Sequence, residues 1–256
     1  MNKEEKSKVQ VLVATMNQED HSILEKMNID SDVIVCNQCN QDKVEKFKYN
    51  GYDVAFYSFA ERGVGLNRNN ALMRATGDIC LFADDDMVYV DDYVTKVTEA
   101  FAKYSDADVI IFNLIEKIPT RYIIKKEHKV GWHNYLRYGT ARVAVRLSSI
   151  KYNGIYFNQC FGGGTEHCHG EDNLFLTSCL RNKLKIYAVP MYIAELTDER
   201  ESTWNKGYDD KYFSDQGELY RAISKNWWKI LCLQDAVRHS KMYGVGAVEC
   251  YRKMTW

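Results

Sequence analysis

The sequence lacks a long apolar run, an apolar N-terminal segment and an excess of charge of one sign. None of its hydrophobic stretches approaches the roughly 20 residues that a membrane-spanning helix needs. The first eight residues are mostly polar, so we expect no signal peptide. The 34 Lys and Arg residues nearly balance the 35 Asp and Glu residues, which gives no reason to expect a nucleic-acid partner. These absences predict a cytoplasmic protein.

A second zinc-binding cysteine pair is also missing. Cys36 and Cys39 have C-x-x-C spacing, and only His167-Cys168-His169 would complete a zinc site with them. Unrelated loop residues are the simpler interpretation. Four of the eight cysteines lie inside apolar runs: Cys36, Cys80, Cys179 and Cys232. Such cysteines behave as small hydrophobic residues in a reducing compartment.

The remaining composition is that of an ordinary globular protein, with 46% hydrophobic and 27% charged residues. In the first half of the chain, short apolar runs alternate with polar turns and helical patterns. Strands are predicted at residues 9–14, 32–36, 52–57, 78–83 and 108–113, with helices after Gly65 and around residues 93–101. This order predicts an α/β fold with a mostly parallel central sheet flanked by helices.

Polar residues follow three of these strands: Thr15-Met16-Asn17, Asn37-Gln38 and Asp84-Asp85-Asp86. Because ligands bind beyond the carboxyl ends of parallel strands, we expect these side chains to converge. Three carboxylates at the end of a buried strand repel one another, and a divalent cation is the simplest compensation. A solvated acidic turn before the next helix is the alternative.

A glycine turn opens the helix that follows the third strand. Gly63 and Gly65 allow the main chain to approach a ligand, and Arg68 near the helix N-terminus suits a phosphate group. Taken singly, these residues fit a plain turn and a surface arginine. Together with the amides and the carboxylates at the same sheet edge, they favour a site for an anionic ligand and a metal.

These residues resemble a known family. The chain is similar to family 2 glycosyltransferases of the GT-A fold, of the kind that builds bacterial polysaccharides. The matching features are Thr15 and Asn17, the G-x-x-R-N-x-A-L segment at residues 65–72, and residues 75–78 leading into F-A-D-D-D-M. The resemblance covers roughly residues 9 to 190.

The resemblance implies roles for the matched residues. Asp84 and Asp86 would form the D-x-D motif, with Asp84 toward the ribose of a nucleotide sugar and Asp86 on a Mn²⁺ or Mg²⁺ ion at its diphosphate. The implied donor-binding residues are Thr15, Met16, Asn17, Asn37, Gln38, Gly65, Arg68, Asn69, Asp84 and Asp85. This family usually carries an Asp where this chain has Asn37-Gln38, although an amide also pairs with uracil.

The second half contains a glycine loop and an acidic helix start. Gly162, Gly163 and Gly164 predict a loop where an acceptor substrate passes close to the main chain. Glu171 and Asp172 then open an amphipathic helix. Helix capping and the helix dipole explain one acidic residue there without any chemistry.

Sugar transfer to a hydroxyl group also needs a general base. By the resemblance, Asp172 is that base and Glu171 orients the acceptor. His167 and His169 are alternative bases, because the pKa of histidine lies near neutrality.

Beyond residue 190 the metal site stays incomplete. Related enzymes often carry a metal-binding His in this region, and this chain has Glu195 and Asp198 instead. The third metal ligand is therefore open. Residues 202–204 and 207–208 predict a flap over the donor.

Tryptophans alternate with basic residues from residue 219 onward. The residues are Arg221, Lys225, Trp227, Trp228, Lys229, Arg238 and Lys241. A helix packed on the catalytic domain with its basic face in water is the favoured interpretation. A peripheral contact with an anionic membrane is the alternative, and would place the protein at the inner membrane surface.

These observations predict three parts: a nucleotide-sugar-binding half (residues 1–115), an acceptor-binding and catalytic half (116–200) and a C-terminal helical extension (201–256). The predicted activity is inverting, metal-dependent transfer from a UDP-sugar to a hydroxyl of a glycan or lipid-linked acceptor in cell-surface polysaccharide synthesis. A sugar nucleotidylyltransferase is less favoured, because residues 15–20 lack its Gly-rich basic signature. A catalytically silent nucleotide-sugar-binding scaffold is the other alternative.

Overall fold

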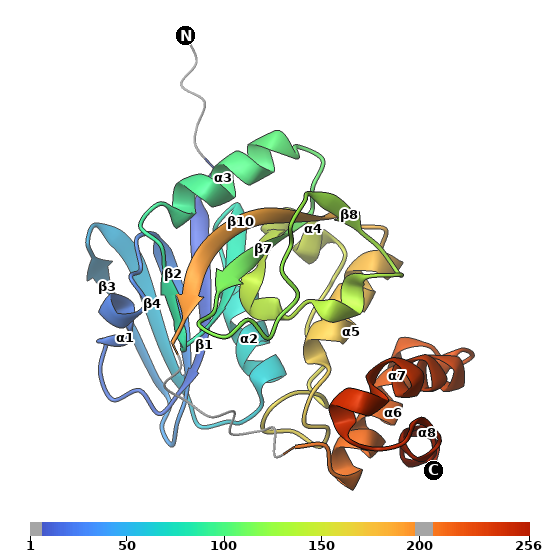
Figure 1. The fold of residues 1–256 in the computed structure, drawn as a ribbon. Coiled ribbons are helices and arrows are strands. Elements are labelled where there is room, and N and C mark those ends of the chain that lie inside the picture. Colours follow the sequence, from blue (N-terminus) through green and yellow to red (C-terminus); the bar gives the residue numbers. More distant parts are fainter. Residues whose placement is uncertain (1–6, 198–206) are drawn as a thin grey trace.

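The computed structural model describes residues 7–197 and 207–256. Within these ranges, ten strands form one sheet in the order β3-β4-β2-β1-β5-β9-β7-β10-β6, with β8 paired to β10 (Figure 1). The strands are β1 (Val9–Met16), β2 (Asp32–Gln38), β3 (Lys43–Tyr49), β4 (Tyr52–Phe59), β5 (Ile79–Asp84), β6 (Met87–Tyr89), β7 (Val109–Ile115), β8 (His128–Val130), β9 (Val143–Arg146) and β10 (Ile186–Leu196). The helices are α1 (Ile23–Lys26), α2 (Val64–Arg74), α3 (Tyr93–Lys103), α4 (Leu147–Tyr152), α5 (Glu171–Arg181), α6 (Asp210–Ile223), α7 (Trp228–Tyr243) and α8 (Ala247–Thr255), with short 3₁₀ helices η1 (Tyr135–Arg137) and η2 (Thr140–Arg142).

The strands on one side of the sheet centre are parallel. β4, β2, β1 and β5 lie side by side, with Thr15 opposite Asn37 and Ala14 opposite Asp84. Nearly every residue of β1, β2 and β5 is buried, as expected for strands covered on both faces. This register brings the carboxyl ends of β1, β2 and β5 to one edge.

Antiparallel strands complete the sheet. β9 lies between β5 and β7, and β3 pairs with β4 across Asn50 and Gly51. Both turn residues have a positive φ, 49° and 90°, as in Asn-Gly hairpins. The predicted α/β fold is confirmed, and the sheet is mixed, with antiparallel β9 inserted between β5 and β7 and antiparallel strands at both ends of the sheet.

Helices cover both faces of the sheet. On one face, α1 and α3 contribute buried apolar residues such as Leu24 and Phe101. On the other face, α2, α4 and α5 contribute residues such as Leu72, Ile150 and Phe175. α2 and α5 therefore share a layer, which allows their first turns to meet.

The three C-terminal helices form a small bundle beside the sheet (Figure 1). Its core includes Phe213 of α6, Cys232 of α7 and Cys250 of α8. Gly217 lets α6 and α8 touch, because a Cβ there would lie 1.9 Å from the carbonyl oxygen of Met254. The predicted helical extension is thus confirmed.

One face of α7 packs into this bundle, and another face is exposed. Ala236 is fully buried, whereas Ile230, Leu233 and Val237 are 55%, 52% and 64% exposed. Since these three residues are spaced three and four positions apart, they form one apolar stripe. Among the described residues, no helix combines the length and hydropathy that crossing a bilayer requires.

Candidate active site

The carboxyl ends of β1, β2 and β5 bring predicted site residues together. Thr15 Oγ1 donates a hydrogen bond to Asp85 Oδ2 (2.6 Å), and Gln18 Nε2 donates one to Thr15 Oγ1 (2.8 Å). Asn37 fixes the turn after β1, because its side-chain amide accepts from Gln18 N and donates to Gln18 O, both at 3.0 Å. The turn after β1 and the acidic turn after β5 are therefore tied together.

Met16 and Asn17 link the end of β1 to the turn before α2. Met16 lies opposite Gln38 in the sheet register. Asn17 has a φ of 54°, and its backbone N–H donates to the carbonyl oxygen of Gln38 (2.9 Å). Gln38 Oε1 in turn accepts from the backbone N–H of Gly63 (2.8 Å).

Arg68 of α2 connects three acidic side chains from two other elements. Its Nη2 donates to Asp84 Oδ1 (2.8 Å) at the end of β5. Its Nη1 donates to Glu171 Oε1 (3.0 Å) and Asp172 Oδ1 (2.9 Å) in the first turn of α5. We call these four residues the Arg68 cluster. It joins the two predicted acidic motifs at one point.

The Arg68 cluster balances one buried cation against three carboxylates. Burial alone would lower the pKa of Arg68, but the carboxylates of Asp84, Asp172 and Glu171 raise it above its ordinary value. Burial, followed by the negative charge of Asp172, raises the pKa of Glu171 despite the contact with Arg68. Arg68 Nε is buried and has no hydrogen-bond partner among the described residues.

Asp172 is the more accessible of the two acids on α5. Its side chain is 28% exposed, against 11% for Glu171. Thr140 Oγ1 donates a hydrogen bond to Asp172 Oδ1, the oxygen that Arg68 also contacts. Gly139 lies beside the other oxygen, since a Cβ at that position would be 3.2 Å from Asp172 Oδ2. One carboxylate oxygen is thus held in place by two donors.

The glycine loop packs against the first turns of α2 and α5. Gly162 has a φ of +101°, and an added Cβ would lie 2.7 Å from the carboxyl group of Glu171. The backbone N–H of Val64 donates to the carbonyl oxygen of Gly163 (3.0 Å). Gly164 also has a positive φ, 82°. The loop lies beside the acids of α5, and its contact with an acceptor stays a prediction.

Two predicted donor-binding residues of α2 are engaged inside the protein. Asn69 forms two hydrogen bonds with the backbone of Phe157, each within 2.9 Å. Gly65 lies against Asn158, because a Cβ at Gly65 would be 2.6 Å from the carbonyl oxygen of Asn158. These contacts fix the start of α2 against residues 157–158, and a contact with the donor stays a prediction.

Asp84 and Asp86 are the candidate metal ligands. Burial, and then the charges of Asp84 and Asp85, raise the pKa of Asp86 to about 6. Arg68 occupies one oxygen of Asp84, Oδ1. Concentrated carboxylate oxygens at a strand end suit Mg²⁺ or Mn²⁺, which take a few protein carboxylates together with substrate phosphates. The residues present therefore fit such an ion.

The end of β10 approaches this acidic turn. Glu195 lies opposite Val88 of β6, and the backbone N–H of Thr197 donates to the carbonyl oxygen of Asp86 (2.8 Å). Asp198 and the predicted flap residues 202–204 lie outside the described residues. Tyr208, from the same predicted flap, packs its ring against Tyr212 and Tyr243 of the C-terminal bundle.

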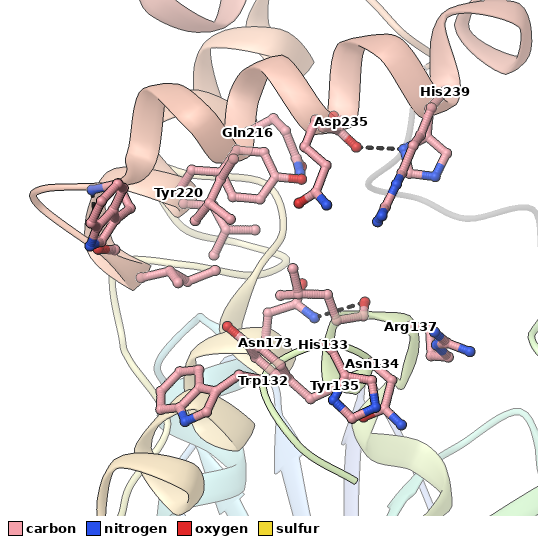
Figure 2. Close-up of a pocket in the computed structure, with 18 of the residues that line it drawn as sticks. Trp132, His133, Asn134, Tyr135, Arg137, Asn173, Gln216, Tyr220, Asp235 and His239 are labelled. Atoms are coloured by element: carbon pink, nitrogen blue, oxygen red, sulfur yellow. Dashed lines mark hydrogen bonds and ion pairs between the residues drawn. The ribbon is translucent and has the colours of Figure 1, made fainter.

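A cavity of about 1260 Å³ opens between the sheet domain and the C-terminal bundle. Figure 2 shows Trp132, Tyr135 and Asn173 on one side of it and Gln216 and Tyr220 on the other. Asn173 directly follows Asp172 on α5. The cavity therefore begins beside the first turn of that helix.

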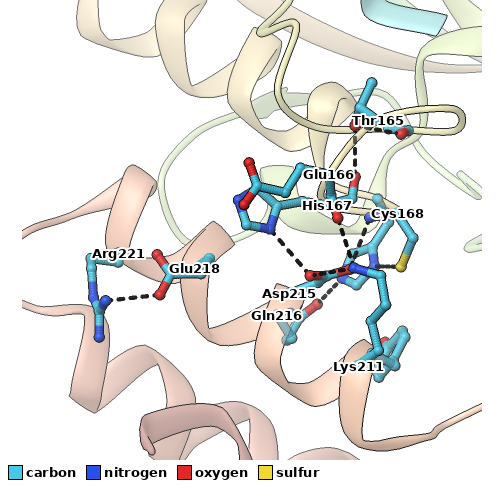
Figure 3. A network of polar contacts seen from close by, with 12 residues as sticks. Thr165, Glu166, His167, Cys168, Lys211, Asp215, Gln216, Glu218 and Arg221 are labelled. Atoms are coloured by element: carbon cyan, nitrogen blue, oxygen red, sulfur yellow. Dashed lines mark hydrogen bonds and ion pairs between the residues drawn. The ribbon is translucent and has the colours of Figure 1, made fainter. Parts of the chain in front are cut away.

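A second polar cluster joins the loop before α5 to α6 (Figure 3). Among the described residues, Cys168, His169 and Asp215 form the only group of three potential metal ligands, with ligand atoms within 4.8 Å of one another. The Asp215 carboxylate already accepts from Lys211 Nζ (2.9 Å) and from the backbone N–H of Cys168 (2.9 Å). These contacts indicate that the cluster holds the loop before α5 against α6. Cys36 and Cys39 are not part of it.

Sequence reasoning missed three residues of the site: Gln18, Gly139 and Thr140. Gln18 stands three positions after Thr15, within the predicted polar turn. Its side-chain amide, which can hydrogen-bond to neighbouring polar groups, was the available sequence signal. Thr140 contacts Asp172 across 32 positions of sequence. No local pattern marks such a contact, so the fold was needed to find it.

Comparisons with known proteins agree with this architecture. A family model described as Glycosyl transferase family 2 matches residues 13–160. The structure of S. aureus TarS 1–349 in complex with UDP-GlcNAc is similar, with a TM-score of 0.64 at 16% identity, over 96% of this chain and 90% of that chain. The structure of the same TarS segment with UDP gives a TM-score of 0.62 at 19% identity, over 91% of this chain and 72% of that chain. At these identities the likeness shows the fold, and a search of curated proteins finds no match.

The buried acid of the Arg68 cluster yields a pH-dependent prediction. Because the folded-state pKa of Glu171 is raised, the folded protein holds a proton that the unfolded chain releases above about pH 4.5. The parent should therefore lose stability, relative to Glu171→Gln, as the pH rises through the folded-state pKa. We expect a relative loss of about 1–2 kcal/mol between pH 5 and pH 8, measured by urea denaturation.

Glu166→Gln is the matched control, because Glu166 is an exposed acid of the preceding loop. Its stability should follow that of the parent across the same pH range. A Glu171→Gln curve parallel to the parent curve would show that Glu171 is not the titrating group.

Proposed function

This chain belongs to glycosyl transferase family 2, and we propose that it transfers a sugar from a UDP-sugar to a hydroxyl group of a glycan or lipid-linked acceptor. The proposed reaction serves the synthesis of a cell-surface polysaccharide, inverts the anomeric carbon and depends on a divalent metal. The TarS structures with UDP-GlcNAc and UDP support the choice of donor, because TarS shares the fold of this chain.

The Arg68 cluster is the observation that carries this proposal. Sugar transfer requires the donor diphosphate and the acceptor hydroxyl to meet in one space. Asp84 of the D-x-D motif and Asp172 at the start of α5 contact the same guanidinium, at 2.8 and 2.9 Å. Asp84, assigned to the donor, and Asp172, assigned to the acceptor, are therefore neighbours.

In this proposal the three aspartates of the acidic turn have different roles. Asp86 and Asp84 would hold Mn²⁺ or Mg²⁺, which would neutralise the charge on the leaving diphosphate. Asp85 accepts a hydrogen bond from Thr15 and fixes the turn. Arg68 contacts Asp84 through Oδ1, and Oδ2 is the oxygen that we assign to the metal.

Asp172 is the general base in this proposal. An inverting transfer needs a base that removes the acceptor proton as the hydroxyl attacks the anomeric carbon. Asp172 is more exposed than Glu171, and Arg68 and Thr140 hold one of its oxygens. The other oxygen of Asp172, Oδ2, is the atom that we propose accepts the proton of the acceptor hydroxyl. Glu171, which is buried beside Gly162, would orient the acceptor.

The contacts of the two loop histidines favour Asp172 over them as the base. His167 Nδ1 contacts Asp215 Oδ1 (3.1 Å), and His169 Nε2 contacts Gln216 Oε1 (2.7 Å). Burial lowers the pKa of His169. Both rings are therefore engaged in the link between the loop and α6.

Asp172→Asn should reduce transfer by about 10²–10⁴-fold, because an amide cannot accept the acceptor proton. The affinity for UDP in the presence of Mn²⁺ should stay within about twofold of the parent. Transfer is measured as UDP release with a UDP-sugar panel and a cell-wall glycan extract, and UDP affinity by calorimetry.

Asp106→Asn is the control, since Asp106 lies before β7 at the opposite end of the strands, where it contacts Lys185. Transfer that survives Asp172→Asn would refute the base assignment. Metal-dependent UDP binding without turnover by the parent would favour the silent scaffold, and nucleotidyl transfer to a sugar phosphate would favour the nucleotidylyltransferase.

Asp86→Asn should weaken UDP binding at least about tenfold in Mn²⁺, because the variant loses a carboxylate that compensates the cation. With EDTA, the parent and the variant should bind UDP equally weakly. Calorimetry with and without Mn²⁺ measures both. Asp91→Asn, an exposed acid five positions further on, is the control. A parent that binds UDP and transfers sugar equally well in EDTA would contradict the metal requirement.

We also propose a peripheral contact between α7 and an anionic membrane surface. Ile230, Leu233 and Val237 form an exposed apolar stripe, and Lys229 and Lys241 are exposed on the same helix. Exposed apolar residues beside lysines suit contact with the interface of an anionic membrane. A lipid-linked acceptor would be met at that surface.

Serine at all three stripe positions should abolish co-sedimentation with phosphatidylglycerol vesicles, because the apolar contact is lost. Phosphatidylcholine vesicles should retain little protein in either case. Val44→Ser with Ile118→Ser is the control, since both side chains are exposed apolar groups elsewhere, 59% and 79% exposed. A parent that stays in the supernatant with both lipids would refute the contact.

A further inference from the structure

The cavity between the sheet domain and the C-terminal bundle has two walls of different origin. One wall consists of the segment before and within η1, together with Asn173 of α5 (Figure 2). The other wall consists of α6 and α7, including Gln216, Tyr220 and Asp235. Protein interiors are close-packed, so a space of about 1260 Å³ is not a packing defect. Its volume exceeds the roughly 300–1000 Å³ of ordinary small-molecule pockets.

Aromatic and planar polar side chains line this cavity. Trp132 and Trp227 are 55% and 64% exposed although both are large apolar residues. Sugar rings present apolar C–H faces that pack on such indole rings, and hydroxyl groups that bond to amides. Asn173 and Gln234 supply amides to the same space. The combination suits a chain of sugar residues better than a purely apolar ligand.

The charged lining of the cavity is mainly basic. Arg137, Arg181, Lys225 and Arg238 all line it. The acidic residue of the lining is Asp235, whose carboxylate accepts hydrogen bonds from His239 Nδ1 (2.5 Å) and from the Tyr243 hydroxyl (3.0 Å). A ligand that carries negative charge is therefore favoured over a neutral one.

The cavity lies beside the helix start that carries the candidate catalytic acids, although neither Glu171 nor Asp172 lines it. His169 and Asn173, which both line it, stand on either side of the segment Gly170-Glu171-Asp172. A chain bound in the cavity would therefore end near the first turn of α5. Gly162 of the glycine loop packs against Glu171 in this same turn, so the cavity and the predicted acceptor loop both lie at the start of α5.

We propose that this cavity binds an acidic oligosaccharide, the part of the acceptor that precedes the hydroxyl to be modified. This inference rests on the proposed glycosyltransferase function and adds the class of its acceptor. Trp132 and Trp227 pack on the sugar rings. The arginines, Arg238 among them, pair with carboxylate or phosphate groups of the chain.

Binding of the full chain to a glycan array tests this inference. The array carries hexamers of galacturonate and hyaluronan, a phosphodiester-linked glycan, and neutral maltohexaose and chitohexaose. We expect binding to the acidic glycans. A comparison of the carboxylate-bearing hexamers with the phosphodiester-linked glycan identifies which charged group the cavity prefers. Trp132→Ala and Trp227→Ala should each weaken binding to the best acidic glycan about tenfold or more. Arg238→Gln should weaken it and reduce its dependence on salt.

Trp256→Ala is the matched control, because this tryptophan is fully exposed at the C-terminus and lies outside the cavity. Thermal unfolding and UDP affinity in Mn²⁺ are measured for every variant. Binding of the parent to no glycan, to neutral glycans equally well, or with equal strength in the Trp132, Trp227 and Trp256 variants would overturn the inference. If UDP still binds in that case, the proposed function survives. A parent that binds glycans and no UDP-sugar would instead contradict the proposed function.

Discussion

The candidate site depends on one buried guanidinium. Arg68 is 5% exposed, and a cation at that depth is tolerated only with paired charges around it. Its partners come from β5 and α5, and Glu171 lies 103 positions further along the chain. Removing one partner from a buried ion pair typically costs about 3–5 kcal/mol. The end of β5 and the starts of α2 and α5 are therefore fixed relative to one another.

The contacts of Arg68 also bear on its predicted role. The sequence predicted that Arg68 binds a donor phosphate, and that role is untested. Both of its Nη atoms contact carboxylates, which favours a positioning role. The acidic triplet then has a distinct contact for each member. Asp84 contacts Arg68 and Asp85 contacts Thr15. Burial, and then the charges of these two neighbours, raise the pKa of Asp86.

The elements around the site could be predicted because their signals are local. The strands at 9–14, 32–36 and 78–83 are confirmed as β1, β2 and β5, and the family resemblance is confirmed by the match over residues 13–160. β3 was missed because it is an exposed edge strand whose lysines and glutamate interrupt the apolar pattern, although Asn50-Gly51 is a typical hairpin turn. The Arg68 cluster and the cavity join distant segments, so the roles assigned from motifs remain predictions.

Short contacts join the C-terminal bundle to the loop and helix start that carry the candidate catalytic acids. Asp215 of α6 accepts from the backbone N–H of Cys168, and Lys211 Nζ donates to the carbonyl oxygen of Glu166 (2.7 Å). A Cβ at Gly170 would lie 2.8 Å from Leu219 of α6. Since α5 begins at the next residue, a shift of α6 would move Glu171 and Asp172 with it. A ligand held against α6 in the cavity would therefore keep a fixed position relative to the proposed base, which a mobile lobe could not provide.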